Sequence, residues 1–237
     1  MIKNHELKCM GHKVSVIIDD DGIEFLGWDE EAEIAVQAFG LEPSICWIIA
    51  QAIENDQLDD LLADASKNGQ AAMVELLIDI GADVNAYNDE ALQWASINGH
   101  AAVVQILLDA GAKVDVGEGQ ALWLAARYGH TAVVQILLAA GADVHAKDDE
   151  ALSWAVTIGH ADVVQILLDT GAEVDAGEGA ALWMAAEKGR ADIVQILLEA
   201  GADVNTYNDA LSIARYRGYT DIVQTLKNWW IEKHSKK

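Results

Sequence analysis

The chain has 237 residues, of which 52% are hydrophobic, so it is long enough and apolar enough to bury a substantial core. It contains 39 acidic residues against 15 Lys and Arg, which gives a formal net charge of −24. A charge of that sign repels phosphate backbones and anionic lipid surfaces, which argues against direct binding to nucleic acid or to a membrane.

The negative charge is concentrated in the middle of the chain. Between residues 14 and 187 there are 32 acids and only four cations, a balance of −28. The four cations are Lys67, Lys113, Arg127 and Lys147. So much like charge destabilises a folded protein through self-repulsion, and it favours a partner whose surface is basic.

Compartment is indicated by the cysteines and by the apolar stretches. Cys9 and Cys46 are too few for a disulfide framework and lack the spacing of a zinc site, which indicates a reducing environment. The first residues show no secretion signal, and the longest apolar stretch, 45–53, is too short to span a bilayer. We therefore expect a cytoplasmic protein.

Residues 1–55 do not repeat. Two strand-like runs, 13–18 and 23–28, are joined by an Asp-rich turn at 19–22 that lacks the acid spacing of a calcium loop. Helices are expected over 29–39 and 43–54. This small α+β segment has too few elements to be stable alone, so we predict that it caps the first repeat.

Residues 56–230 repeat every thirty residues, with Gly99, Gly129, Gly159 and Gly189 at equivalent places. Six units are recognisable, of which the first and last are degenerate. Apolar residues recur at helical spacing on two short segments of each unit, which predicts two helices joined by a glycine turn. Such short helix pairs bury their apolar faces only by stacking, so we predict a mainly α solenoid followed by a basic tail at 231–237.

Tryptophans alternate between two positions in successive units. Trp94 and Trp154 stand two residues after the first-helix leucine of their repeat. Trp123 and Trp183 directly follow the equivalent leucine. Periodic placement on a helix favours core packing for the first two. For Trp123 and Trp183 packing and partner binding are about equally supported, because tryptophan is enriched in interface hot spots.

The repeat resembles the ankyrin repeat. The matching residues are Ala91, Leu92, Ala95, Gly99 and His100, and the run 133–144 that ends in Gly-Ala-Asp-Val. The chain departs from that family in lacking the T-P-L-H start and in having a period three residues shorter, which predicts trimmed fingers between units. In this respect it is similar to arrays of giant viruses, phages and bacteria, which implies a protein of a microbe or of a virus-infected host cell.

The resemblance implies that a partner binds on a concave side made of the fingers and the exposed ends of the first helices. The finger candidates are Tyr87, Asp89, Glu90, Glu118, Asp148, Asp149, Glu150, Glu178 and Tyr207. The helix candidates are Ile97, Asn98, Trp123, Arg127, Tyr128, Thr157, Ile158, Trp183, Glu187, Lys188 and Tyr216.

We expect a non-enzymatic scaffold that binds a basic protein, with no cofactor and no metal. No Ser, Cys or Thr stands in a nucleophile motif. The recurring His100, His130 and His160 would lie about 8 to 10 Å apart on stacked helices, too far to share a zinc ion. An alternative is an inhibitor, such as an immunity or counter-defence protein, that mimics nucleic acid and blocks a nuclease or another nucleic-acid-binding protein.

Overall fold

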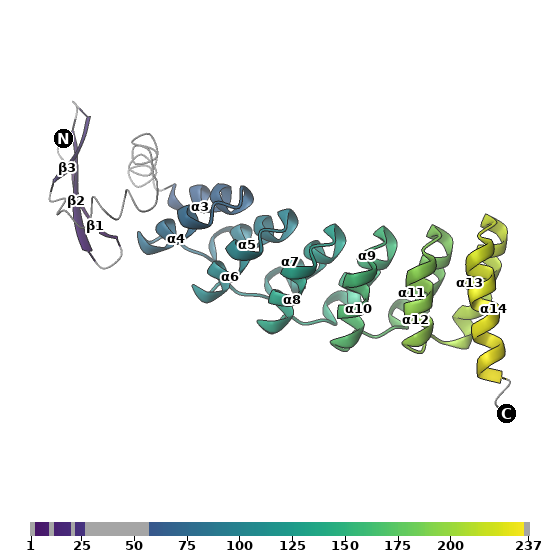
Figure 1. The fold of residues 1–237 in the computed structure, drawn as a ribbon. Coiled ribbons are helices and arrows are strands. Elements are labelled where there is room, and N and C mark those ends of the chain that lie inside the picture. The colour runs from purple at the N-terminus through teal and green to yellow at the C-terminus, as the bar shows by residue number, and fades with distance from the viewer. Residues whose placement is uncertain (1–2, 10–11, 20–21, 27–56, 235–237) are drawn as a thin grey trace. The chain divides into compact units, whose positions relative to one another are not determined.

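The structure is a computed structural model that describes residues 3–9, 12–19, 22–26 and 57–234 (Figure 1). The chain divides into two compact units. The first comprises Met1–Ala95 with Ala102–Lys113, and the second comprises Ser96–Ala101 with Val114–Lys237. In the described residues there are three strands, all in the first unit, and twelve helices.

The strands form an antiparallel sheet of order β1-β2-β3. They are β1 (Lys3–Cys9), β2 (His12–Asp19) and β3 (Gly22–Leu26). Strand β2 contains the predicted run 13–18, and β3 overlaps the predicted run 23–28 over residues 23–26, with Val16 opposite Phe25. Strand β1 was not predicted, because its residues KNHELKC carry too few apolar side chains to show an alternating pattern. The predicted helices at 29–39 and 43–54 lie outside the described residues.

Six helix pairs follow, as the thirty-residue period predicts. Those wholly or mainly in the first unit are α3 (Leu58–Lys67), α4 (Ala71–Asp79), α5 (Ala86–Asn98) and α6 (Ala101–Asp109). In the second unit they are α7 (Val116–Tyr128), α8 (Thr131–Ala139), α9 (Ala146–Ile158), α10 (Ala161–Asp169), α11 (Ala176–Lys188), α12 (Ala191–Glu199), α13 (Val204–Arg217) and α14 (Thr220–His234). The last helix continues four residues into the predicted tail.

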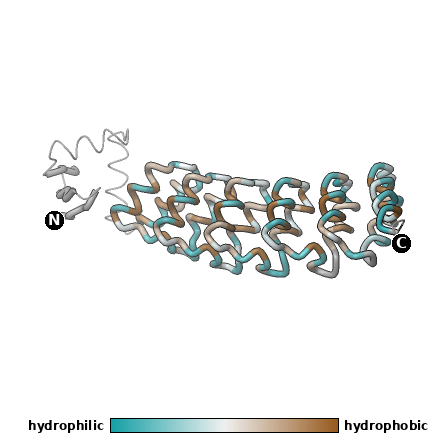
Figure 2. Tube along the Cα trace, turned by 60° about the horizontal axis from the view of Figure 1, so that its bottom comes forward, coloured by the Kyte–Doolittle hydropathy of each residue, from teal (hydrophilic) through white to brown (hydrophobic). Residues whose placement is uncertain are grey.

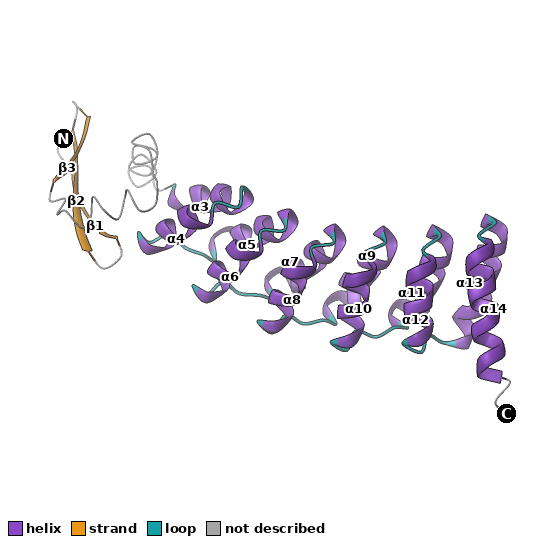
Figure 3. Ribbon diagram, in the orientation of Figure 1, coloured by secondary structure: helices purple, strands orange, loops and turns teal. Residues whose placement is uncertain are grey.

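Within the second unit the helices form two rows (Figures 1 and 3). The first helices α7, α9, α11 and α13 pack against one another, and the second helices α8, α10, α12 and α14 pack in a parallel row. Gly129 ends α7 with a left-handed conformation, φ 75°, that only glycine adopts without strain. The chain then turns directly into α8, which places each second helix beside its first helix.

The core lies between these rows. Leu122 of α7 and Leu137 of α8 are fully buried, and so are their counterparts in the neighbouring pairs. Ala125 is also fully buried, and its small side chain lets adjacent first helices approach closely. In Figure 2 hydrophobic segments recur in every helix pair of the second unit, interspersed with hydrophilic turns. Each pair thus completes the core of the next.

Among the helices in the described part of the chain, none is both long enough and apolar enough to cross a membrane.

Candidate interaction surface

The fingers are single left-handed turns. In each, three consecutive residues at the start of a first helix have positive φ: 87–89, 117–119 and 147–149. An L-residue in this conformation costs roughly 1 to 2 kcal/mol. At 117–119 glycine occupies two of the three places, whereas the other two fingers carry only side-chain-bearing residues. The fingers are therefore short, as the thirty-residue period predicts, and two of them hold local strain.

An aspartate in a finger, shortly before a finger or, at Asp59, in the first turn of α3 holds the loop that follows one repeat later. The carboxylate accepts a hydrogen bond from a backbone N–H about one repeat later. The donor and acceptor pairs are Asp83 to Asp59 (2.7 Å), Lys113 to Asp89 (3.2 Å), Asp143 to Asp115 (3.0 Å), Glu173 to Asp149 (3.1 Å) and Asp203 to Asp175 (3.0 Å). Where Gly119 stands in place of a finger aspartate, Asp115 takes over the role. A fraction of the acidic residues is thus structural.

Asp89 and Asp149 are buried, each with only 3% of its surface exposed. Burial raises the pKa of the Asp89 carboxyl, although the Lys113 amide and the Lys113 charge act in the opposite direction. Asp149 also lies 3.3 Å from Nδ1 of His145. These two carboxylates connect parts of the array and are not available on its surface.

The recurring histidines are turn residues that join successive repeats. His130 Nε2 hydrogen-bonds the carbonyl oxygen of Ile97 at 2.8 Å, and His160 Nε2 hydrogen-bonds that of Arg127 at 3.0 Å. In the next repeat the Arg190 guanidinium donates to the Ile158 carbonyl instead. In the described residues no group of three or more His, Cys, Asp or Glu side chains is placed to hold a metal ion.

Three of the four cations between residues 14 and 187 lie over tryptophan rings. The pairs are Lys67 over Trp94 (4.5 Å to the ring centroid), Arg127 over Trp154 (4.2 Å) and Lys147 over Trp123 (5.9 Å). Trp123 and Trp154 also stack on each other, with ring centroids 6.4 Å apart. A cation over an aromatic face is attracted by the ring quadrupole, so these scarce cations stabilise contacts between neighbouring repeats.

The predicted partner-binding residues differ in exposure. Exposed side chains are those of Tyr87, Asn98, Glu118, Tyr128, Asp148, Ile158, Trp183, Lys188 and Tyr216. Half-buried ones are Glu90, Ile97, Trp123, Arg127, Glu150, Thr157 and Glu187. Asp89, Asp149 and Tyr207 are buried, which removes them from any exposed contact surface. The side chain of Glu178 lies outside the described residues.

Several half-buried candidates are engaged within the chain. Glu90 and Glu150 accept hydrogen bonds from the indole N–H groups of Trp94 and Trp154, at 3.0 and 3.1 Å. Glu187 accepts a hydrogen bond from the Arg217 guanidinium at 2.7 Å, and this bond lowers the pKa of the Glu187 carboxyl. The two Glu–Trp bonds each span one helical turn within a repeat, whereas the Glu187–Arg217 bond joins successive repeats.

Each first helix of the second unit carries an exposed large hydrophobic side chain, and Tyr219, Trp230 and Ile231 of the last repeat are exposed as well. Tyr128, Ile158, Trp183 and Tyr216 all belong to first helices. Helices α8, α10 and α12 carry no exposed large hydrophobic side chain among their described residues. We call the exposed side of α7, α9, α11 and α13, together with the fingers at 117–119 and 147–149, the finger face. Grouped exposed apolar side chains are typical of a binding surface.

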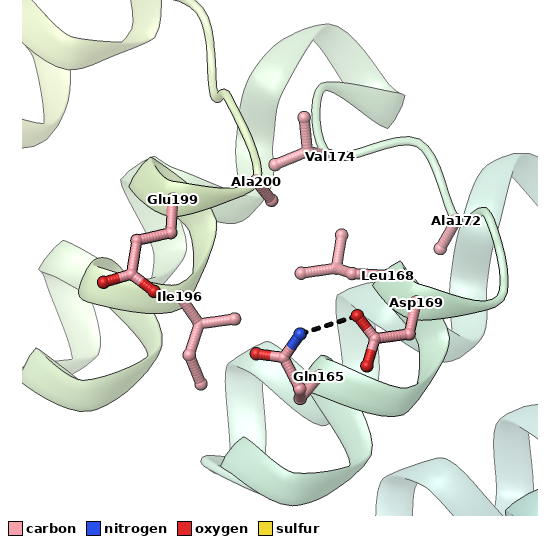
Figure 4. Close-up of a pocket in the computed structure, with 8 residues that line it drawn as sticks. All are labelled: Gln165, Leu168, Asp169, Ala172, Val174, Ile196, Glu199 and Ala200. Atoms are coloured by element: carbon pink, nitrogen blue, oxygen red, sulfur yellow. Dashed lines mark hydrogen bonds between the residues drawn. The ribbon is translucent and has the colours of Figure 1, made fainter.

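On the side of the second unit away from the finger face, a pocket lies between α10 and α12 (Figure 4). It measures about 330 Å³. Gln165 and Asp169 of α10 are hydrogen-bonded to each other at 2.8 Å on its wall, and Ile196 and Glu199 of α12 face them. None of its lining residues was predicted to bind a partner, and its polar groups already pair within a helix.

Comparison with protein families identifies the repeat. The family model for ankyrin repeats, three copies long, matches residues 33–118, 62–148, 122–208 and 152–236. The chain belongs to the ankyrin repeat family. Among curated proteins nothing matches it.

A solved ankyrin repeat structure supports the assignment. The crystal structure of the human ASB11 ankyrin repeat domain superposes with a TM-score of 0.63 at 28% sequence identity. The match covers 71% of this chain and 82% of that one. Ankyrin repeats indicate a scaffold for protein–protein interaction, and the fold is typically a non-enzymatic interaction module. The expected resemblance is therefore confirmed, including the helical solenoid architecture.

Proposed function

We propose that this ankyrin repeat protein is a non-enzymatic scaffold that binds a partner protein with a basic surface through its finger face. The observation that carries the proposal is that every first helix of the second unit presents an exposed large hydrophobic side chain on that face, whereas α8, α10 and α12 present none among their described residues. Exposed carboxylates stand at its edge, notably Glu118 and Asp148 of the fingers. An apolar centre with a charged rim is the usual composition of a protein interface.

The formal charge supports a basic partner. The net charge of −24 attracts a cationic protein over a distance set by the ionic strength, which speeds encounter and selects against acidic partners. The buried and hydrogen-bonded aspartates are unavailable for direct contact. Glu118 and Asp148 remain exposed, so they are the carboxylates to test.

The test compares two double charge reversals that change the net charge equally. Glu118 and Asp148 are replaced by Lys on the finger face, and Asp169 and Glu199 are replaced by Lys on the second helices. The probe is an octa-arginine peptide, titrated by calorimetry at low and at physiological salt. We expect the finger-face variant to lose about tenfold more affinity than the second-helix variant.

Two outcomes contradict the proposal. Equal losses in both variants would mean that net charge alone attracts the peptide and that the finger face is not the binding surface. If the octa-arginine peptide does not bind the wild-type protein even at low salt, the proposal of a basic partner is wrong.

The inhibitor hypothesis shares this acidic surface and differs in what the partner does. If the array mimics nucleic acid, a nucleic-acid-binding target must release duplex DNA when it binds this protein. A competition assay with labelled duplex separates the two ideas once a target has been captured. Simultaneous binding of DNA and of this protein would exclude mimicry and leave the scaffold proposal intact.

A further inference from the structure

Trp183 is the exception in the row of tryptophans. Its counterpart sixty residues earlier, Trp123, has Lys147 over its ring and Trp154 stacked beside it. Trp183 is 38% exposed, and in the described part of the chain it has neither a cation nor a second ring against it. Its indole is an aromatic platform without the contacts that the same platform has elsewhere in the molecule.

The sequence explains why these contacts are missing. Sixty residues after Lys147 the chain has Tyr207, which is buried and stacks on Trp229 with centroids 5.8 Å apart. The last repeat is one residue shorter, with Gly218 only 59 residues after Gly159, so its counterpart of Trp154 is Ile213. Both replacements lie in the last repeat, whose first helix α13 packs beside α11. The space beside Trp183 is therefore filled only in part, by a smaller aliphatic side chain and without a cation.

That space is a shallow pocket of about 360 Å³ lined by Trp183 of α11 and by Asp209, Ser212, Ile213 and Tyr216 of α13. Tyr216 is 85% exposed, so it offers a second aromatic surface at the pocket wall. Asp209 is exposed and supplies a carboxylate. The pocket thus combines a flat apolar platform with a negative charge.

We propose that this pocket binds an arginine side chain of the partner protein, with the guanidinium over the Trp183 ring and its N–H groups directed to Asp209. The inference rests on the proposed function, because it names the side chain that the finger face recognises. The chain itself provides the precedent, since Arg127 covers Trp154 at 4.2 Å. A guanidinium is preferred to an ammonium because it is planar, stacks on aromatic rings and donates to a carboxylate in a fork.

Neighbouring cations do not fill the site. Glu187, one helical turn after Trp183, holds the Arg217 guanidinium at 2.7 Å and the Lys188 ammonium at 3.3 Å. The charges of Arg217 and Lys188 are therefore partly balanced by Glu187 within the chain. The remaining carboxylate of the pocket, Asp209, has no ion pair in the described residues.

The test uses the full chain labelled with ¹⁵N and the tripeptide acetyl-Gly-Arg-Gly-amide as probe. The chain has eight tryptophans, and the Trp183 indole signal is assigned by its disappearance in Trp183→Ala. We expect that signal to shift saturably with the arginine tripeptide. The citrulline tripeptide, which has the same shape without the charge, is expected to leave it unmoved.

Variants make the test specific to the pocket. Titrated with octa-arginine, Trp183→Ala is expected to lose about five- to thirty-fold in affinity, the range that a cation–π contact provides. The matched control is Trp230→Ala, another exposed tryptophan, and Asp209→Asn is matched by Asp169→Asn on α10. Ser212→Arg places a guanidinium of the chain itself at the pocket and is expected to block the tripeptide while the circular dichroism spectrum is retained.

The outcomes separate this inference from the proposed function. If octa-arginine binds but Trp183→Ala binds it equally well, the arginine pocket is wrong and the acidic scaffold stands. If octa-arginine does not bind wild type at low salt, the proposed function fails. An equal shift with the citrulline tripeptide would also overturn the pocket, because it would show simple apolar contact.

Discussion

Gly119 illustrates how a single residue position is fixed by two requirements at once. Its φ is +77°, and a Cβ added there would lie 2.7 Å from the Cβ of Ala146. We predict that Gly119→Ala lowers the free energy of unfolding by about 2 to 4 kcal/mol, from the left-handed backbone plus the methyl overlap. Gly141→Ala is the control, because its φ is +93° with open space around it. Equal losses in urea unfolding would show that the overlap is relieved at no cost.

Asp89 gives a prediction about pH. Because burial raises the pKa of its carboxyl in the folded state, the folded protein binds the proton more tightly than the unfolded chain does. The ionised carboxylate therefore destabilises the fold progressively as pH rises from the unfolded value of 3.8 toward the folded value. Asp89→Asn keeps an oxygen that accepts the Lys113 N–H. We expect this variant to be more stable than wild type at pH 7, and the difference to vanish below about pH 4.

The control for Asp89→Asn is Asp148→Asn, which changes an exposed carboxylate in an equivalent finger. Because this side chain is exposed, its replacement is expected to change the stability little. Thermal unfolding of both variants between pH 3 and pH 8 decides the matter. A gain for Asp89→Asn that persists at the lowest pH would rule out ionisation of Asp89 as its cause.

The buried aspartates also show that the burial of a single residue could not always be predicted from the sequence. Asp148-Asp149-Glu150 has the composition of a solvated charge run, and we predicted all three as partner contacts. The structure exposes Asp148, half-buries Glu150 and buries Asp149. The burial follows from a hydrogen bond to Glu173, 24 residues away, and no local pattern encodes a bond of that length.

Among the elements, the helices were predictable and the first strand was not. The helix pairs follow from apolar residues at helical spacing and from glycines that end each first helix, both of which recur six times. The left-handed fingers required the structure, because three consecutive positive φ values at Lys147, Asp148 and Asp149 contradict the usual preference of those residues. The pocket at Trp183 was not predicted, because Ser212 and Ile213, which line it, were not among the predicted partner-binding residues. Aligning the last repeat, with its one-residue shortening, on the repeat that carries Trp154 would have indicated it, because Ile213 then replaces that tryptophan.

The turn histidines join one element to the next, and this leads to a prediction for His160. His160→Ala removes the hydrogen bond to the Arg127 carbonyl and the ring that covers Gly129, and is expected to cost about 1 to 2 kcal/mol. His160→Arg is expected to cost clearly less, because Arg190 makes the equivalent bond to Ile158 one repeat later. Chemical unfolding that finds the Arg variant as unstable as the Ala variant would refute this equivalence.

For the whole molecule, the charge of −24 predicts that added salt stabilises the fold. Raising ionic strength from about 10 to about 150 mM shortens the Debye length from roughly 30 to roughly 8 Å, which screens repulsion between repeats. Salt also weakens ion pairs such as Lys147 with Glu118, but these are exposed and contribute little. We therefore expect the midpoint of thermal unfolding to rise by a few degrees.

The second-helix variant with Asp169 and Glu199 replaced by Lys is the matched comparison, because it reduces the net charge from −24 to −20. It is expected to be more stable than wild type at low salt and to gain less from added salt. A midpoint that falls with salt in the wild-type chain would mean that attractive pairs outweigh the repulsion.

The row of tryptophans and cations has a consequence for how this array changes in length. Trp94 and Trp154 take their cations from the preceding repeat, whereas Trp123 takes Lys147 from the following one. A single inserted or deleted repeat would bring two like neighbours together and leave one indole without its cation. We therefore expect the array to lengthen or shorten by pairs of repeats, sixty residues at a time, so that the number of repeats changes by two.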